Sequence, residues 1–234
     1  VRQEAEGQIK RERETRELAP KAYRLSQYSD RAVCGLYRRG KDAMNGELPK
    51  LLYGEERGET DAGAIALWAW ATQRVLDYAE SEPRLDKSRA MVCGHSRLGK
   101  TALFCGATDE RFFLAHSNDS GCSGAAITRD KVGERVEQIT RNFPYWFCEN
   151  YKQYVGKEQE MPFDQHYLIA SIAPRYTYVA SALEDSWADP ASEMLSCVAA
   201  SPAYESLGMR GIVCEDRLPA AGDEYHEGSI GYHL

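Results

Sequence analysis

The chain has 234 residues, 43% of them hydrophobic and 10% aromatic, which is enough apolar material for one sizeable core. Its formal net charge of −7 gives no general affinity for nucleic acid, since phosphate binding needs clustered basic side chains. No apolar run approaches the roughly 18 residues that span a bilayer, and no cysteine pair has zinc-ribbon spacing. The sequence therefore predicts one domain over residues 1–234, with residues 1–60 poorly assigned and with no nucleic acid, membrane or metal partner; the oligomeric state stays open.

The first clear element begins near residue 60. Thr60 and Asp61 are both placed to cap the first turn of a helix, and Pro83 prevents that helix from continuing. Between them, apolar and small residues recur at the spacing of one helical face: Ile65, Trp68, Ala69, Thr72, Val75, Leu76 and Ala79. This spacing predicts an amphipathic helix of about five turns.

Strand and helix patterns alternate after this helix. The predicted strands are 90–93, 112–116 and 176–181, and the predicted helices are 98–107, 132–147 in whole or in part, and 164–172. Such alternation is typical of the α/β class, in which a mostly parallel sheet is flanked by helices on both faces. Ligands of these proteins bind beyond the carboxyl ends of the strands, so the loops after the predicted strands hold the candidate site.

Residues 89–104 fit two incompatible chemistries. Gly94, Gly99, Lys100 and Thr101 match a phosphate-binding loop, in which backbone N–H groups and a lysine surround a polyphosphate. Gly94 also lies two places before Ser96, as a tight strand-to-helix turn that presents a serine nucleophile requires. The phosphate interpretation lacks a well-placed acidic residue at a strand end for the nucleotide's magnesium. A nucleotide hydrolase remains the alternative hypothesis.

The nucleophile interpretation depends on residues further along the chain. A serine attacks usefully only when a histidine accepts its proton and a carboxylate orients that histidine. Hydrolases of this type place the acid after the serine and the histidine last. Asp185 follows the third predicted strand, and His226 and His233 come later, so the order fits. One departure is Leu98, where the usual turn has a glycine; the glycine here is Gly99, one place late.

The segment from Asp61 to His233 resembles the bacterial glucuronoyl esterases of carbohydrate esterase family 15. The strings that carry the resemblance are Gly94-His95-Ser96-Arg97-Leu98-Gly99-Lys100-Thr101-Ala102-Leu103, Ser117-Asn118-Asp119-Ser120-Gly121-Cys122, Asn142-Phe143-Pro144-Tyr145-Trp146-Phe147, Asp164-Gln165-His166, Ala173-Pro174-Arg175, Ser181-Ala182-Leu183-Glu184-Asp185-Ser186-Trp187-Ala188-Asp189-Pro190 and Ile230-Gly231-Tyr232-His233. These strings include both candidate catalytic segments, so the resemblance favours the serine interpretation.

The resemblance implies an α/β-hydrolase fold and a serine hydrolase that uses neither metal nor cofactor. Its implied substrate is the ester between the 4-O-methyl-glucuronic acid branches of xylan and lignin alcohols, and its implied location is secreted or periplasmic. By position Ser96 is the nucleophile, and Arg97 faces the oxyanion, where a pre-aligned donor is typically worth about 3 kcal/mol. Lys100, Glu134 and Trp187 match the positions that bind the glucuronoyl sugar, with Trp187 as an apolar wall.

The sequence leaves the identities of two members of the triad, the acid and the histidine, undecided. The family places its acid either after the strand that follows the nucleophile helix, which Asp119 matches, or at the later hydrolase position, which Asp185 matches. Asp119 is slightly preferred, because it is closer in sequence to Ser96. The family's catalytic histidine lies a few residues beyond the Gly-Tyr-His segment, and no residue before Leu234 matches it. Either His233 serves as the base, or the base lies outside this chain, which would then be a fragment. A carbohydrate-binding remnant without catalysis is a further alternative.

Overall fold

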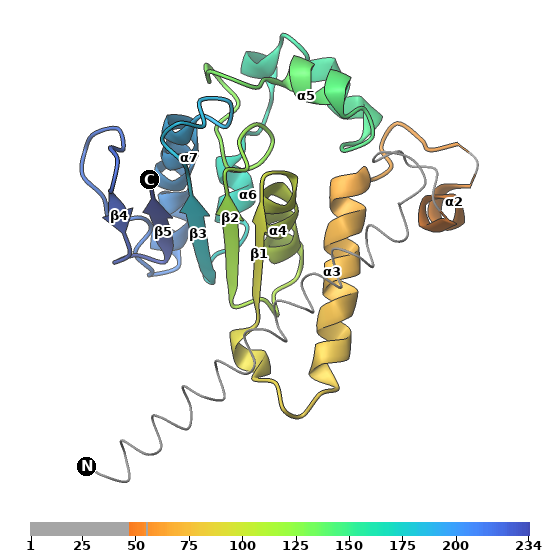
Figure 1. Cartoon of the computed structure of the whole chain (residues 1–234), viewed down its shortest axis with the longest axis horizontal. Coiled ribbons are helices and arrows are strands. Elements are labelled where there is room, and N and C mark those ends of the chain that lie inside the picture. Colours follow the sequence, from red (N-terminus) through yellow and green to blue (C-terminus); the bar gives the residue numbers. More distant parts are fainter. Residues whose placement is uncertain (1–46, 55) are drawn as a thin grey trace.

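The computed structural model describes residues 47–54 and 56–234, so the predictions for residues 1–46 lie outside the described part of the chain. Helices and strands alternate through this part (Figure 1). In chain order the helices and strands are α2 (Glu47–Tyr53), α3 (Ala64–Glu80), β1 (Met91–His95), α4 (Arg97–Thr108), β2 (Leu114–Asn118), α5 (Val136–Asn142), α6 (His166–Ala170), β3 (Tyr176–Ala180), α7 (Pro190–Ser206), β4 (Glu224–Tyr225) and β5 (Ile230–His233). None of these helices is long and apolar enough to cross a membrane.

Five strands form one sheet in the order β1-β2-β3-β5-β4. Strands β1, β2, β3 and β5 are mutually parallel, and β4 pairs antiparallel with β5. The register places His95, Asn118, Ala180 and His233 in one row across the sheet. Because parallel strands end at the same edge, the residues that follow β1, β2 and β3 gather there. The predicted mostly parallel sheet is confirmed.

The core lies on one face of this sheet. Alternate strand residues, including Val92, Ala115 and Val179, are buried against α3, α4, α6 and α7. On the opposite face, Met91 and Tyr176 are 56% and 37% exposed. The prediction of helices on both faces is therefore wrong for the described residues. The strands are added in one direction along the sheet, and right-handed crossovers in one direction place every connecting helix on the same face.

Helix α3 confirms the predicted amphipathic helix, but its N-terminus is capped differently. Its N-cap is Gly63 rather than Thr60 or Asp61, and no side chain caps it. The first two N–H groups of the helix donate to the carbonyl oxygens of Tyr145 and Trp146, at 2.9 and 3.2 Å. A Cβ at Gly63 would lie 2.3 Å from the oxygen of Trp146. The close approach of two backbones thus replaces the predicted side-chain cap.

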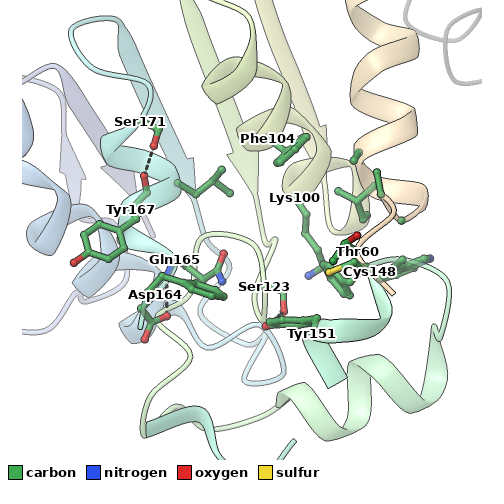
Figure 2. Close-up of a pocket in the computed structure, with 18 residues that line it drawn as sticks. Thr60, Lys100, Phe104, Ser123, Cys148, Tyr151, Asp164, Gln165, Tyr167 and Ser171 are labelled. Atoms are coloured by element: carbon green, nitrogen blue, oxygen red, sulfur yellow. Dashed lines mark hydrogen bonds between the residues drawn. The ribbon is translucent and has the colours of Figure 1, made fainter. Parts of the chain in front are cut away.

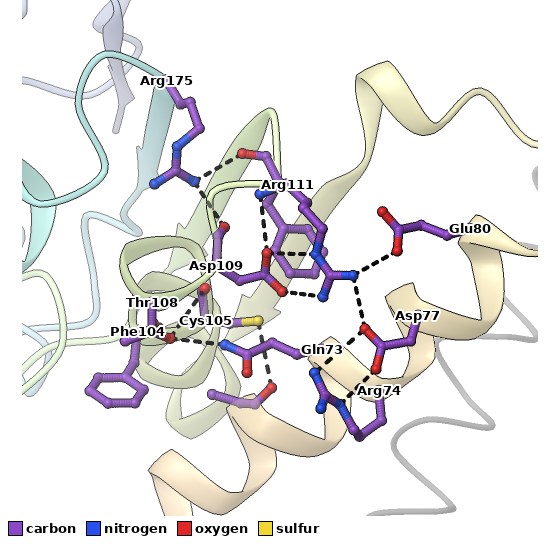
Figure 3. Close-up of polar contacts among 12 residues, drawn as sticks. Gln73, Arg74, Asp77, Glu80, Phe104, Cys105, Thr108, Asp109, Arg111 and Arg175 are labelled. Carbon is purple, nitrogen blue, oxygen red and sulfur yellow. Dashed lines mark hydrogen bonds and ion pairs between the residues drawn. The ribbon is translucent and has the colours of Figure 1, made fainter.

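An arginine joins the end of α3 to the turn between α4 and β2 (Figure 3). The Arg111 guanidinium lies 2.6 Å from a carboxylate oxygen of Asp109 and 2.8 Å from one of Asp77 and one of Glu80. Its hydrogen bond to Asp109 lowers the pKa of that carboxyl. Arg175 donates to the backbone carbonyl of Asp109 at 3.1 Å. This network therefore links three segments at the end of the sheet opposite the candidate site.

The remaining predictions vary in accuracy along the chain. All three predicted strands and the helix after Ser96 exist, with ends shifted by up to two residues. Only Val136–Asn142 of the predicted helix 132–147 is α-helical. Helix α7, with 17 residues, and strands β4 and β5 were not predicted. The C-terminal part of the sheet is therefore known from the structure alone.

Candidate active site

Ser96 lies in a strained turn between β1 and α4. Its φ of 55° is positive, which a residue with a side chain adopts only under constraint. The constraint on one side is Gly94, where a Cβ would lie 2.1 Å from the carbonyl oxygen of Leu98. On the other side, the Ser96 N–H donates to the carbonyl of Asn118 at 2.8 Å, which ties the turn to the end of β2. The hydroxyl is thus presented at the carboxyl edge of the sheet, as the nucleophile interpretation predicts.

The displaced glycine lets α4 approach the neighbouring strand. A Cβ at Gly99 would lie 2.9 Å from the Cβ of Ser120 and 3.0 Å from the Oγ of Ser117. The phosphate interpretation needs the two residues that follow, but Thr101 donates back to a carbonyl of its own helix at 3.0 Å. Lys100 is buried and donates to two backbone carbonyls. The nucleotide-binding alternative is therefore not supported.

Arg97, beside the nucleophile, is exposed and rests against an aromatic ring. Its guanidinium carbon lies 5.3 Å from the ring centroid of Trp146. That ring is buried and stacks on Phe143 with centroids 3.7 Å apart. An exposed cation over a fixed aromatic face gains about 0.5–1 kcal/mol and loses orientational freedom. The structure thus holds the guanidinium of Arg97 against Trp146, and its oxyanion role stays a prediction.

The two candidate acids follow neighbouring strands. After β2, the Asp119 carboxylate accepts from the N–H of Ala182 at 2.7 Å and from the side chain of Asn118 at 2.8 Å. After β3, the Asp185 carboxylate accepts from the N–H of Ala188 at 3.0 Å, within its own turn. Both acids therefore lie at the carboxyl edge, and the choice between them stays open.

His233 lies away from the nucleophile. It is in β5, three strands from β1, so about 14 Å separates the two backbones. Its Nδ1 is 2.8 Å from the hydroxyl of Tyr178. The structure therefore does not bring His233 to Ser96. Among the described residues, the histidine beside Asp119 is His95, whose Nδ1 lies 3.7 Å from the carboxylate.

The three predicted sugar contacts lie around the same loops. The N–H of Glu134 donates to the carbonyl of Trp187 at 3.0 Å, and the Trp187 side chain is 51% exposed. Gly133, with φ of 69°, allows this approach, because a Cβ there would lie 2.5 Å from that same carbonyl oxygen. Burial raises the pKa of Glu134, whereas the charge of Lys100 lowers it. Glu134 and Trp187 are thus neighbours, as the sugar-binding prediction requires, and Lys100 interacts with Glu134 through its charge.

Lys100 is held on the loop that carries Asp119, residues 119–122, which we call the acid loop. Its ammonium donates to the carbonyl oxygens of Ser120 and, at 2.7 Å, of Cys122. Burial lowers its pKa, and nearby carboxylates oppose that effect. The lysine therefore fixes the acid loop from the α4 side.

A cavity of about 520 Å³ opens on the helical side of the sheet (Figure 2). Aromatic side chains make up much of its wall, and Lys100 reaches it from α4. Ser96, Asp119 and Trp187 do not line it. The cavity is therefore lined by one predicted sugar-binding residue, Lys100, but not by the predicted nucleophile, by Asp119 or by Trp187.

One buried acid beside the candidate site is not predicted by the sequence. Glu193, in the first turn of α7, is completely buried and accepts hydrogen bonds from the acid loop and from Ser181. No motif marked this residue, because its stretch is rich in serine and alanine and shows no apolar periodicity. An acid a few residues after an Asp-Pro helix start was the available signal.

Fold and site together define a class of protein. A serine on a strained strand-to-helix turn, with carboxylates at the ends of the next strands of a parallel sheet, is the arrangement of the α/β-hydrolase type of serine hydrolase. The structure forms this turn with the predicted residues Gly94, Ser96 and Gly99.

Comparison with known proteins narrows the class. A family model described as "Glucuronyl esterase, fungi" matches residues 32–208. "Carbohydrate esterase MZ0003" from an unknown prokaryotic organism is 45% identical over 172 residues, which are 74% of this chain and 39% of that protein. The CE15 glucuronoyl esterase from Teredinibacter turnerae superposes with a TM-score of 0.76 at 30% identity, over 92% of this chain and 56% of that one.

A second similar structure holds a ligand. A variant of the glucuronoyl esterase from Sporotrichum thermophile, in complex with methyl 4-O-methyl-β-D-glucopyranuronate, is 28% identical with a TM-score of 0.61, over 69% of this chain and 45% of that one. The chain thus spans about half the length of the proteins it matches, or less. It belongs to the glucuronoyl esterase family, carbohydrate esterase family 15.

Proposed function

We propose that the chain contributes the nucleophile, the oxyanion donor and the sugar contacts of a glucuronoyl esterase. Its substrate would be the ester between the 4-O-methyl-glucuronic acid branches of xylan and lignin alcohols. The observation that carries the proposal is the strained, exposed Ser96 between Gly94 and the end of β2. The methyl glucuronate ester bound by the Sporotrichum thermophile relative supports the substrate class.

The reaction would proceed by acyl transfer. The Ser96 Oγ attacks the ester carbonyl while an imidazole, oriented by Asp119 or Asp185, accepts its proton. The carbonyl oxygen becomes an oxyanion, which the guanidinium of Arg97 stabilises. The C–O bond to the alcohol then breaks, the alcohol takes the proton, and water cleaves the glucuronoyl ester of Ser96. Each step conserves charge and needs no group other than these side chains, an imidazole and water.

The sugar would lie over the acid loop. Glu134 and Lys100 offer an acceptor and a donor that suit the hydroxyls of a glucuronoyl ring. Trp187 is half exposed beside Glu134 and offers an apolar face to the sugar. Such fixed polar groups orient the ester carbonyl toward Ser96.

We also propose a secreted or periplasmic location, because xylan and lignin are polymers of the plant cell wall. Fractionation of cells that produce the protein tests this location. Recovery in the periplasm or medium would support it, and recovery in the cytoplasm alone would contradict it.

Hydrolysis of benzyl glucuronate tests the function. The chain should release benzyl alcohol faster than buffer, by more than the roughly 10³-fold that oxyanion and binding contacts supply without a complete triad. Ser96→Ala should lower the release to that residual level, because the variant cannot form the glucuronoyl ester of Ser96. Release that is unchanged in the variant, or no release above buffer, would contradict the proposal. Saccharide binding without any release would instead indicate the carbohydrate-binding remnant.

A further inference from the structure

Glu193 lies behind the acid loop and is the buried acid that the proposed reaction leaves without a role. Its side chain is 0% exposed. One carboxylate oxygen accepts from the N–H of Gly121 at 2.8 Å and from the hydroxyl of Ser120 at 3.3 Å. The other accepts from the hydroxyl of Ser181 at 2.5 Å. A buried carboxylate with three donors is rigidly placed, and it fixes the groups that donate to it.

Lys100 holds the same loop from the other side. Its ammonium accepts no hydrogen bond and donates to the carbonyls of Ser120 and Cys122, whereas Glu193 receives the N–H of Gly121 between them. The loop therefore lies between a buried cation and a buried anion, each meeting the backbone groups of opposite polarity. The two charges also favour each other's ionised forms.

Glu193 also connects the acid loop to the segment after β3, which receives the Asp119 side chain. Asp119 accepts from the N–H of Ala182, directly after Ser181. The Ser181 hydroxyl and the Gly121 N–H therefore both donate to the Glu193 carboxylate. Each donor is within two residues of a partner in the hydrogen bond between Ala182 and Asp119. Movement of Glu193 would shift the two segments that aim Asp119.

We propose that Glu193 is a positioning residue for the hydrolysis, which fixes the acid loop so that Asp119 is aimed at the catalytic imidazole. The proposal rests on the proposed function and adds a role that acts through Asp119. Glu193 does not touch the substrate in this proposal.

The ionisation of Glu193 gives the proposal a signature. Burial raises its pKa to about 7, although the hydrogen bonds from Ser181 and Gly121 oppose this. The charged and titratable groups that act on it or respond to it are Lys100, Asp119, Lys131, Cys197 and Tyr232. The chemical shift of the Gly121 amide proton should therefore change with pH with a midpoint near 7, because the carboxylate that accepts this proton gains and loses a charge.

Backbone amide spectra of the chain test the contact without requiring catalysis. In Glu193→Gln the chemical shift of the Gly121 amide should no longer depend on pH near 7. The chemical shift of the Ala182 amide should change, because its acceptor Asp119 moves. Glu205→Gln, an exposed acid of the same helix, is the matched control and should change neither signal. A Gly121 amide that does not titrate in the unmodified chain, or an unshifted Ala182 amide in Glu193→Gln, would overturn the proposal.

Kinetics separate positioning from a merely structural role. With benzyl glucuronate, Glu193→Gln should lower kcat by on the order of 10- to 100-fold with KM unchanged, as a small misplacement of a catalytic group does. Ser181→Ala removes one donor and keeps the charge, so it should lower kcat less even if Glu193→Gln folds poorly. An unchanged kcat in both variants would overturn the proposal. A rate of hydrolysis that Ser96→Ala leaves unchanged would instead contradict the proposed function, whatever the amide spectra show.

Discussion

The turn around Ser96 and the acid loop meet at one edge of the sheet, yet different forces fix them. The turn is shaped by backbone contact, because Gly94 and Gly99 have no room for a Cβ. Its side chains, Ser96 and Arg97, are exposed. The acid loop is shaped by buried charge, since Lys100 and Glu193 hold its carbonyl and N–H groups from opposite sides.

Because of this difference, the exposed side chains of the turn should contribute mainly to the reaction, and the buried charges beside the acid loop should contribute to stability as well. Replacing an exposed side chain of the turn should change the reaction and leave folding nearly intact. Replacing a buried charge beside the acid loop should change both, because a partner is left in a low dielectric without compensation.

Lys100→Met should be the most damaging change. It leaves the carbonyls of Ser120 and Cys122 without their donor and removes the cation that favours ionised Glu193. Loss of one partner of a buried charge pair costs about 3–5 kcal/mol of unfolding free energy. Urea unfolding at pH 7 measures this loss.

The double variant Lys100→Met/Glu193→Gln sharpens this test. If the two buried charges compensate each other, the double variant should be more stable than the sum of the single losses implies. Additive losses would show that the lysine acts only through its carbonyl contacts.

Much of the turn was predictable from the sequence, whereas the support of the acid loop was not. Gly94 and Ser96 are local in sequence, and the backbone that they form depends on neighbouring residues. The shift of the second glycine to Gly99 could be judged only once its contact with β2 was known. Glu193 meets Gly121 across 72 positions, and no local pattern encodes such a contact.

The same distinction explains the fold. Strands β1, β2 and β3 have short apolar runs that the sequence displays, and α3 has a clear apolar stripe. Helix α7 buries Ser192, Ser196 and Ala200 along with apolar residues, so its buried face is not marked by hydrophobicity. The one-sided burial of the sheet depends on strand order, which the sequence pattern does not give.

Arg97→Met should lower the rate of the reaction far more than the stability of the fold. Loss of an oxyanion donor lowers kcat about 10²- to 10³-fold, roughly 3–4 kcal/mol. Because Arg97 is exposed and the variant loses its contact with Trp146, the unfolding free energy should fall by only about 0.5–1 kcal/mol. Benzyl glucuronate kinetics and urea unfolding measure the two effects. A large loss of stability with unchanged kcat would contradict the oxyanion role and would show that an exposed side chain of the turn also maintains the fold.

Glu193→Gln should change how stability depends on pH. The folded pKa of Glu193, about 7, lies above its ordinary value of 4.5, so the folded state holds the proton more tightly between these values. Stability from this group is therefore greatest below pH 4.5 and falls by roughly 3 kcal/mol as the pH rises to 7. Thermal or urea unfolding between pH 4.5 and 8 should show a flatter profile in the variant. Identical profiles, or a steeper one in the variant, would contradict the burial of a titrating carboxyl here.

Gly94→Ala should distort the turn without touching a charge. The new Cβ would meet the Leu98 carbonyl, which belongs to the backbone and cannot turn away. Such overpacking costs about 1–3 kcal/mol of unfolding free energy, and the shifted Ser96 should lose activity. Gly58→Ala is the matched control, since its Cβ would meet only the flexible side chain of Asp61, at 3.3 Å. Equal effects of the two substitutions would show that the turn tolerates a Cβ.

Arg111→Met should have the smallest effect, although it removes three ion pairs. The guanidinium is 34% exposed, and partly solvated pairs contribute about 0.2–1 kcal/mol each, so a loss near 1 kcal/mol is expected at pH 7. Because Arg111 lowers the pKa of Asp109, this contribution is present above the unfolded pKa of that carboxyl and fades as the pH falls through the folded one. Arg84→Met, which loses one exposed local pair, is the control. A loss as large as that of Lys100→Met would show that burial does not make a charge more important for stability in this protein. A loss that persists at low pH would show that Arg111 does not act through its ion pair with Asp109.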